Sequence, residues 1–253
     1  MLFGLDGKRA IVTGATRGIG RAIAAELARA GARVAVSGNE AEGCVLVARD
    51  FVSQGFDAVA IPCDVAIDSD LEELVAKTLE AFGGIDILVC NAGVARHHGP
   101  SAQASDEAYE KTMRINARSP FKLCNLVAPQ MASRRDGAII IVSSLAGLRG
   151  NRAIAVYAMS KAANAQLARN LAVEWGPMNI RANAISPGLV ETEFASPILS
   201  DSERLAQRIG RTPLRRVGTP TEIAGCAVFL ASPAGAFVTG HNLVCDGGAL
   251  IAD

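Results

Sequence analysis

Tyr157 and Lys161 are the residues of this 253-residue chain whose types and spacing suggest acid–base chemistry. Four positions apart on a helix, the two side chains share a face. A free tyrosine has a pKa of about 10 and is a poor base at neutral pH, but a neighbouring ammonium group favours its phenolate form. Such a group can protonate a carbonyl oxygen or deprotonate an alcohol while another molecule carries the hydride. The spacing by itself favours a solvated surface pair, so the rest of the sequence has to decide.

The apolar run at residues 137–144 ends in two serines, Ser143 and Ser144. A serine hydroxyl at the end of a strand can reach into a crevice and polarise the oxygen atom of a substrate. Successive side chains of a strand point to opposite faces, so only one of the two serines can do this. The alternative for each is a hydroxyl that caps the following turn. The residues alone leave the choice between the two open.

The segment "VTGATRGIG", residues 12–20, has the glycine pattern of a loop that binds a pyrophosphate. The loop lacks side chains at three glycines, where the backbone has to turn and a dinucleotide has to approach. A helix that begins here offers unpaired N–H groups and the positive end of its dipole. A plain tight turn is the alternative, but the surrounding βαβ pattern favours a dinucleotide site. We expect it to include Gly14, Thr16, Arg17, Gly18, Ile19 and Gly20.

The residues after the second predicted strand bear on the choice of dinucleotide. Gly38 stands where an acidic residue would bind the ribose 2′-hydroxyl of NAD. Arg17 can instead face a 2′-phosphate, to which Ser37 and Asn39 can donate hydrogen bonds. These residues favour NADP over NAD, which stays open as the alternative. Two observations argue the other way: Arg17 fits a solvated loop arginine, and Glu40 would repel a phosphate.

Two further loops follow predicted strands at the same edge. Asp64 and Val65 are expected to contact the adenine, or else to begin the next connection as turn residues. Asn91, Ala92 and Gly93 follow the fourth strand and place small residues where the backbone must approach another group. Asn91 either contacts the ligand directly or holds the loop through hydrogen bonds to the backbone.

Short runs rich in valine and isoleucine predict the strands that carry these loops. The runs lie at residues 9–13, 33–37, 57–62, 85–90, 137–144, 180–186 and 242–246. They show no alternation of apolar and polar residues, which indicates strands covered on both faces. Because helical stretches separate them, the predicted fold class is α/β, a doubly wound Rossmann-type parallel sheet of about seven strands with helices on both faces. Ligands of such a sheet bind at the carboxyl ends of its strands.

Three of the expected helices lie beside these loops. One spans residues 20–31 and stops at Gly31, a second begins at Ser105, and a third covers residues 156–175. No linker or repeat divides the chain, so we expect a single dinucleotide-binding and catalytic domain over residues 1–253. No strand can be placed in residues 189–218, and a long excursion at the functional edge predicts a substrate lid.

The composition narrows the kinds of ligand. Basic and acidic residues number 25 each, so the chain has no net charge with which to attract nucleic acid or anionic lipid. We expect a small-molecule substrate and neither a nucleic-acid nor a membrane partner. The six cysteines lack a C-x-x-C motif, which predicts reduced thiols and neither a metal site nor disulfides. The amino-terminal residues show no signal peptide or membrane span, which favours a cytoplasmic protein.

Taken in order, the motifs resemble those of the short-chain dehydrogenase/reductase family, in its form of roughly 250 residues. The resemblance runs from "VTGATRGIG" through "NAG", "IVSSLAG", "YAMSK" and "ISPG" to "VTGHNLVCDGG" and covers nearly the whole chain. It implies that Tyr157 is the general acid/base and that Lys161 lowers its pKa and binds the nicotinamide ribose. It selects Ser144 as the partner of the substrate oxygen. It also implies that Asn116 disturbs its helix and helps hold a water that relays protons to Lys161.

The resemblance adds expectations for the rest of the site and for assembly. Pro187, Gly188, Val190 and Thr192 are expected to line the amide end of the cofactor, and Leu145, Asn151, Ile154, Gly188 and Phe194 to select the substrate together with the lid. Family members that prefer NADP often carry arginine where this chain has Asn39, which leaves Arg17 as the main phosphate ligand. His97 and His98 are expected at the pocket rim. The family is usually tetrameric, so a homotetramer is predicted.

Three functions fit these residues. The first is an oxidoreductase that transfers a hydride between NADP(H) and a carbonyl compound or secondary alcohol. The second is a reductase of 3-oxoacyl thioesters, for which Arg211, Arg215 and Arg216 would bind a phosphopantetheine or carrier unless they are a solvated run. The third is a nucleotide-sensing regulator on the same scaffold, which would be expected to lose the tyrosine, lysine or serine. All three residues are present.

Overall fold

Seven parallel strands form one central sheet in the order β3-β2-β1-β4-β5-β6-β7 in the computed structural model, which describes residues 1–252. The strands are β1 (Arg9–Thr13), β2 (Arg33–Ser37), β3 (Ala58–Ala60), β4 (Ile87–Cys90), β5 (Gly137–Val142), β6 (Ile180–Pro187) and β7 (Asn242–Cys245). The chain reverses its direction of travel across the sheet between β3 and β4. The predicted doubly wound α/β fold is thereby confirmed, and the carboxyl ends of β1 and β4 meet at the reversal.

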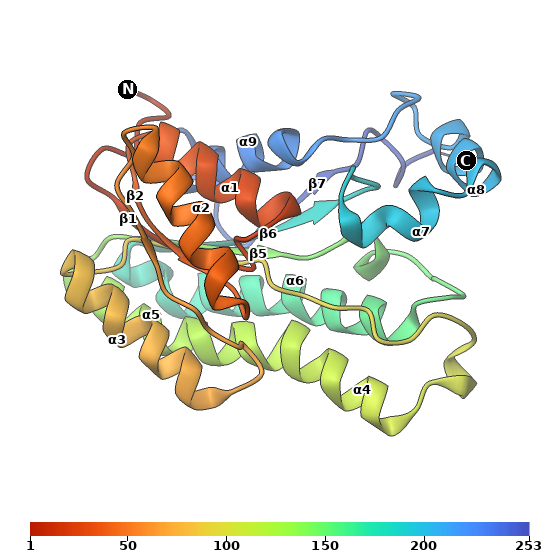
Figure 1. Ribbon diagram of the computed structural model, residues 1–253, viewed down its shortest axis with the longest axis horizontal. Coiled ribbons are helices and arrows are strands. Elements are labelled where there is room, and N and C mark those ends of the chain that lie inside the picture. Colours follow the sequence, from red (N-terminus) through yellow and green to blue (C-terminus); the bar gives the residue numbers. More distant parts are fainter. Residues whose placement is uncertain (253) are drawn as a thin grey trace.

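Helices cover both faces of the sheet (Figure 1). One face carries α1 (Gly18–Arg29), α2 (Ala41–Ser53) and α9 (Pro220–Ala231), and the other carries α3 (Asp68–Phe82), α5 (Ser119–Arg134) and α6 (Ala155–Trp175). Each face has its own apolar core, to which Leu27 and Leu230 belong on the first face and Leu74 and Met131 on the second. Because β1, β4 and β5 are buried on both sides, their sequences are apolar at nearly every position.

Local signals set the ends of the helices near the site. Gly31 ends the first helix with a φ of +104°, a left-handed conformation that glycine adopts without strain. Helix α4 (Asp106–Met113) begins after Ser105, whose hydroxyl accepts a hydrogen bond from the Ala108 amide. The expected helix over residues 156–175 corresponds to α6, which begins one residue earlier.

Residues 189–218 contain no strand, as predicted, and fold into short helical pieces. These are a 3-10 turn at Glu193–Ala195, α7 (Ser196–Leu199) and α8 (Ser202–Gly210). A single bridge between Val190 and Gly218 closes the base of the segment. Figure 1 shows α7 and α8 at one end of the molecule, beside its carboxyl terminus.

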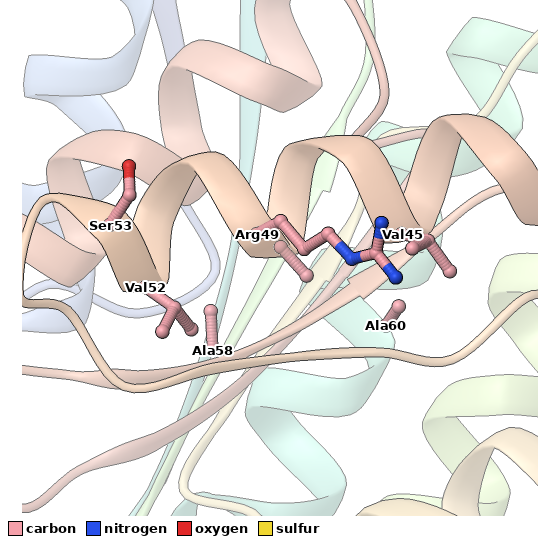
Figure 2. A pocket seen from close by; sticks show the side chains of 7 residues that line it. Val45, Arg49, Val52, Ser53, Ala58 and Ala60 are labelled. Carbon is pink, nitrogen blue, oxygen red and sulfur yellow. The ribbon is translucent and has the colours of Figure 1, made fainter.

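A shallow groove of about 400 Å³ lies between α2 and the edge strand β3. Val45, Ala48, Val52 and Ala58 form most of its lining, and Arg49 extends along the helix above it (Figure 2). Because β3 is the edge of the sheet farthest from β7, this groove is separate from the crevice that the sequence motifs surround.

Candidate active site

Tyr157, Lys161 and Ser144 meet at the carboxyl end of β5. Tyr157 and Lys161 lie one turn apart on α6, and the Lys161 Nζ atom is 5.6 Å from the centre of the tyrosine ring. The Ser144 hydroxyl faces the Tyr157 hydroxyl, close enough to act on its pKa. The pair is therefore not a solvated surface pair: Lys161 is only 3% exposed, and its ammonium donates to the Val142 carbonyl over 2.7 Å.

The two serines after β5 have different roles. Ser143 is buried, and its hydroxyl donates to the Lys161 carbonyl over 2.7 Å, which fastens the strand to the helix. Ser144 is half-buried, and its hydroxyl accepts a hydrogen bond from the Ala146 amide while facing Tyr157. Only Ser144 is placed to contact a substrate oxygen beside the tyrosine, as strand alternation requires.

Asn116 lies in a π-helical turn, Arg114–Arg118, that interrupts the helix between α4 and α5. Its side chain bonds both backbone groups of Val94 over 2.8 Å and donates to the Ser160 hydroxyl over 3.0 Å. Ser160 in turn donates to the Tyr157 carbonyl over 2.7 Å. The fully buried amide thus ties the loop after β4 to the first turns of α6.

Burial shifts the pKa values of both central groups away from their ordinary values. It lowers the pKa of Lys161 to about 8, because removing the ammonium from water disfavours its charged form. Burial also raises the pKa of Tyr157 to about 12, against the opposing effect of Ser144. The net shift of the tyrosine pKa is therefore upward, opposite to the expected lowering. Desolvation outweighs the effect of Ser144, and the phenol is protonated at neutral pH.

The glycine-rich loop leaves a cradle beside these groups. Gly14 has a φ of +63°, and a Cβ atom on Gly20 would lie 2.0 Å from the Gly14 carbonyl oxygen, so neither position admits a side chain without rearrangement. Helix α1 begins at Gly18 with no side chain capping its first N–H groups and no acidic residue in its first turn. These open amides fit the pyrophosphate of a dinucleotide.

Asn91 holds this loop rather than presenting its side chain to solvent. Its amide nitrogen donates to the Thr13 and Gly14 carbonyls over 3.0 and 3.1 Å. The Thr13 hydroxyl accepts from the backbone amides of Asn91 and Ala92 over 3.0 and 3.2 Å. Of the two roles left open for Asn91, the structure supports the structural one. Thr13 thus helps to hold the loop after β4 against the glycine-rich loop. This residue was missed in the sequence, where its only signal was a polar side chain at the end of the apolar run 9–13.

The end of the cleft expected to hold a 2′-phosphate differs from prediction in one residue. Ser37 is completely buried, and its hydroxyl has no partner among residues 1–252, so it does not face the surface where the ribose would lie. Arg17 and Asn39 are exposed. Arg17 lies 3.5 Å from a carboxylate oxygen of Glu40 on one side and of Glu193 on the other.

Comparison with known proteins places this geometry in a family. A family model described as enoyl-(acyl carrier protein) reductase matches residues 14–249. The human protein dehydrogenase/reductase SDR family member 4 is 36% identical over 96% of this chain and 88% of its own length. The chain belongs to the short-chain dehydrogenase/reductase family.

Solved structures of this family match nearly the whole chain. A gluconate 5-dehydrogenase from Burkholderia cenocepacia, in complex with NADP and tartrate, has a TM-score of 0.96 and 35% identity over 100% of this chain and 98% of its own. A 7α-hydroxysteroid dehydrogenase, complexed with NADH and 7-oxo glycochenodeoxycholic acid, has a TM-score of 0.94 and 37% identity over 98% and 96%. This member of the family is thus an oxidoreductase of alcohols and carbonyl compounds that uses a nicotinamide cofactor.

The loop expected over the amide end of the cofactor lies across the cradle. The Gly188 amide donates to the Cys245 carbonyl over 3.0 Å, which ties the loop to β7 beyond Pro187. Thr192 approaches the glycine-rich loop so closely that its methyl group would lie 3.3 Å from a Cβ atom on Gly18. Val190 is buried beneath the loop.

Two residues expected to contact ligands have local structural roles. The Asp64 carboxylate accepts a hydrogen bond from the Ala66 amide and forms a turn beside Val65, which supports the turn alternative. The Asn151 side chain accepts from the amides of Ala153 and Ile154 over 2.9 and 3.2 Å. Its oxygen is therefore occupied in arranging the start of α6.

Other residues expected around the substrate do gather near the tyrosine. The Phe194 ring, which is exposed, lies 5.6 Å from the Tyr157 ring, and Leu145 is buried directly after Ser144. His97 bonds the Pro100 carbonyl within a loop that pairs with Ile154 through Gly99. The lid and the histidine loop therefore border the tyrosine from two sides.

Proposed function

We propose that the protein is an NADP-preferring oxidoreductase that interconverts a ketone and a secondary alcohol, with Tyr157 as its general acid/base. The observation that carries the proposal is the meeting of Ser144, Tyr157 and Lys161 beside an open dinucleotide cradle. A regulator without catalysis would have no need of the buried lysine, which is costly to desolvate.

The residues divide the reaction between them. When bound, NADP(H) supplies or accepts the hydride. The Ser144 hydroxyl donates to the substrate oxygen, and the protonated Tyr157 hydroxyl gives its proton to that oxygen during reduction. Lys161, charged below about pH 8, stabilises the phenolate that remains. Asn116 holds α6 against the loop after β4 through its bonds to Val94 and Ser160.

Arg17 supports NADP as the preferred cofactor. Its exposed guanidinium stands at the glycine-rich loop, and Gly38 offers no carboxylate for the NAD ribose. The two solved relatives named above hold NADP in one case and NADH in the other. Glu40 opposes the preference, so we expect NADPH to be favoured by a moderate factor, about tenfold in kcat/KM.

The test is oxidation of NADPH and NADH against a panel of cyclic ketones, hydroxy ketones and 3-oxoacyl thioesters. We expect turnover of simple ketones with NADPH ahead of NADH. Preferential turnover of acyl thioesters would support the reductase alternative instead. That alternative is weakened by two of its three arginines, because Arg216 pairs with Glu222 and Arg215 bonds the Gly210 carbonyl. Binding of NADPH without turnover of any ketone would contradict the proposal.

We also propose a homotetramer. Apolar side chains are exposed on the long helices, among them Phe121 on α5 and Met159 and Val173 on α6, and Phe237 is fully exposed before β7. Covering such residues stabilises an assembly. Light scattering at micromolar concentration should give four times the chain mass, and a monomeric mass would refute the tetramer. Among residues 1–252, no helix is both long and apolar enough to cross a bilayer. The cytoplasmic location stays a prediction.

A further inference from the structure

The two loops that border Tyr157 on its substrate side contain basic residues and no acidic ones. Residues 94–104 include Arg96, His97 and His98, residues 144–156 include Arg149 and Arg152, and neither segment contains an aspartate or glutamate. The loops are joined, because the Gly99 amide donates to the Ala153 carbonyl over 2.8 Å. In a chain with equal numbers of acidic and basic residues, this local excess of positive charge is an asymmetry of the site.

The lid adds two arginines to these loops, Arg208 on α8 and Arg211 directly after it. Arg208 is half-buried, and desolvation together with the charges of Arg149 and Arg211 lowers its pKa. The Thr212 hydroxyl, just after this helix, donates to the Arg208 carbonyl over 2.9 Å, and a Cβ atom on Gly247 would lie 2.9 Å from the Thr212 methyl group, so the end of α8 packs against the carboxyl-terminal segment. The Arg149 guanidinium also donates to the Ala249 carbonyl over 3.1 Å, which brings the carboxyl-terminal segment to the same place.

No acidic partner balances this cluster within residues 1–252. There, no carboxylate lies within 4.0 Å of a set of five residues, called the basic rim below: Arg96, Arg149, Arg152, Arg208 and Arg211. The Arg208 side chain makes no hydrogen bond to any residue of that part either. Other arginines of the same lid are paired, Arg204 with Asp201 and Arg216 with Glu222. Of the five, Arg208 is half-buried and the other four are exposed. A partly desolvated guanidinium without an opposite charge is unfavourable, so Arg208 is the member of the rim that an anion would stabilise most.

The basic rim stands on the substrate side of the tyrosine. Residues 145–154 leave Ser144 and lead straight into the helix that holds Tyr157. Phe194, at the start of the lid, contacts the Tyr157 ring, and α8 follows a few residues later at the same end of the molecule (Figure 1). Arg17, which we assign to the cofactor, lies instead at the glycine-rich loop, with two carboxylates beside it.

Resting on the oxidoreductase function proposed above, we infer that the physiological substrate is an anion whose carboxylate or phosphate is bound by Arg208 with Arg149 and Arg211, while its carbonyl or hydroxyl group lies at Ser144 and Tyr157. A guanidinium group binds either anion through two parallel hydrogen bonds. Its entry would balance the charge of the basic rim and close α8 over the site.

The test measures NADPH-dependent reduction of methyl ketones that carry a terminal carboxylate, in a series of increasing chain length. Each keto acid is compared with its neutral primary amide. Dihydroxyacetone phosphate beside dihydroxyacetone forms the phosphate arm. In at least one arm, the charged compound should have a KM about tenfold or more below that of its neutral partner, the gain typical of a charge-assisted pair. The arm that shows the gain identifies the anion.

Two variants assign the gain to the cluster. Arg208→Gln should bring the two KM values within about threefold of each other, and Arg208→Lys, which keeps the charge but not the two parallel hydrogen bonds, should retain only part of the difference. Neither change should alter turnover of the neutral ketone or the KM for NADPH. The control is Arg204→Gln on the same helix, whose arginine is paired with Asp201 and should leave the ratio unchanged.

The outcomes separate this inference from the function on which it rests. Equal KM values for charged and neutral ketones in both arms, or an anion preference that survives in Arg208→Gln, would overturn the inference and leave the oxidoreductase function standing. Absence of turnover for every ketone, charged or neutral, would overturn the proposed function and the inference with it.

Discussion

The candidate active site and the basic rim differ in how their polar groups are paired. Around Tyr157, the hydroxyl of Ser143, the amide of Asn116 and the ammonium of Lys161 all have partners within the protein. The arginines of the rim have no carboxylate partner among residues 1–252. The contrast teaches that the proton-transfer geometry is built into the fold, whereas the substrate-binding geometry awaits an anion. It also predicts that changes in the two regions have different consequences.

Lys161→Met should have the largest effect on the active-site side of the comparison. Turnover should fall about a thousandfold, because the phenolate of Tyr157 loses its stabilising charge. The free energy of unfolding should nevertheless rise by about 1 kcal/mol at pH 7, because a buried ammonium with a lowered pKa is replaced by an apolar side chain. Denaturant unfolding of the wild type and the variant measures this.

The sign of that gain depends on pH. Lys161 is charged when folded below about pH 8, but when unfolded it stays charged up to about 10.5, so the cost of burying the charge is greatest below pH 8 and vanishes toward 10.5. The stability gain of Lys161→Met should shrink accordingly. Lys77→Met removes an exposed lysine paired with Glu73 and should give no gain in the free energy of unfolding at pH 7 or near pH 10.5. A variant less stable than the wild type at pH 7 would show that the ammonium is not a burden to the fold.

The pH profile of reduction sharpens the same comparison with an intact protein. The kcat/KM reports groups of the free enzyme, so it should fall about tenfold per pH unit above about pH 8, as Lys161 loses its proton. Tyr157, with a pKa of about 12, stays protonated through this range, so it should cause no second decrease in kcat/KM. A rate that stays level up to pH 10 would indicate that the lysine charge takes no part.

Substitutions at Arg17 should change KM less than substitutions in the basic rim. The carboxylates of Glu40 and Glu193 already partly balance the charge of Arg17, whereas the rim has no such neighbour. Arg17→Gln should raise the KM for NADPH by about fivefold and leave that for NADH unchanged. Glu40→Gln should act in the opposite direction and lower the KM for NADPH a few-fold, because it frees the guanidinium 3.5 Å away. Equal effects on NADPH and NADH would mean that Arg17 does not bind the 2′-phosphate.

The parts of the molecule that depend on local pattern could be predicted from the sequence. The strands were readable because a strand buried on both faces must be apolar throughout, as in β4 and β5. The choice of Ser144 over Ser143 needed the family resemblance, since alternation says that only one faces the crevice and not which. Asn116 had no signal of its own, because nothing local shows that an asparagine will interrupt a helix in a π turn.

What failed depends on contacts between distant segments. Ser37 looked available at a strand end, but its hydroxyl is completely buried in the folded protein. The lowered pKa expected of Tyr157 considered one neighbour, and the desolvation that reverses it comes from the whole site. Arg208 had no signal in the sequence, because its surroundings come from segments far along the chain, among them the carboxyl-terminal residues that Arg149 also contacts.

The most direct test of the central claim is a single-turnover measurement of hydride transfer from NADPH to a ketone by Tyr157→Phe and by the wild type. The substitution removes only the hydroxyl that faces Ser144. We predict a transfer rate lower by about a thousandfold or more, with the dissociation constant of NADPH changed by no more than a few-fold. A variant that transfers hydride at the wild-type rate would contradict the role of Tyr157 and with it the mechanism proposed for this site.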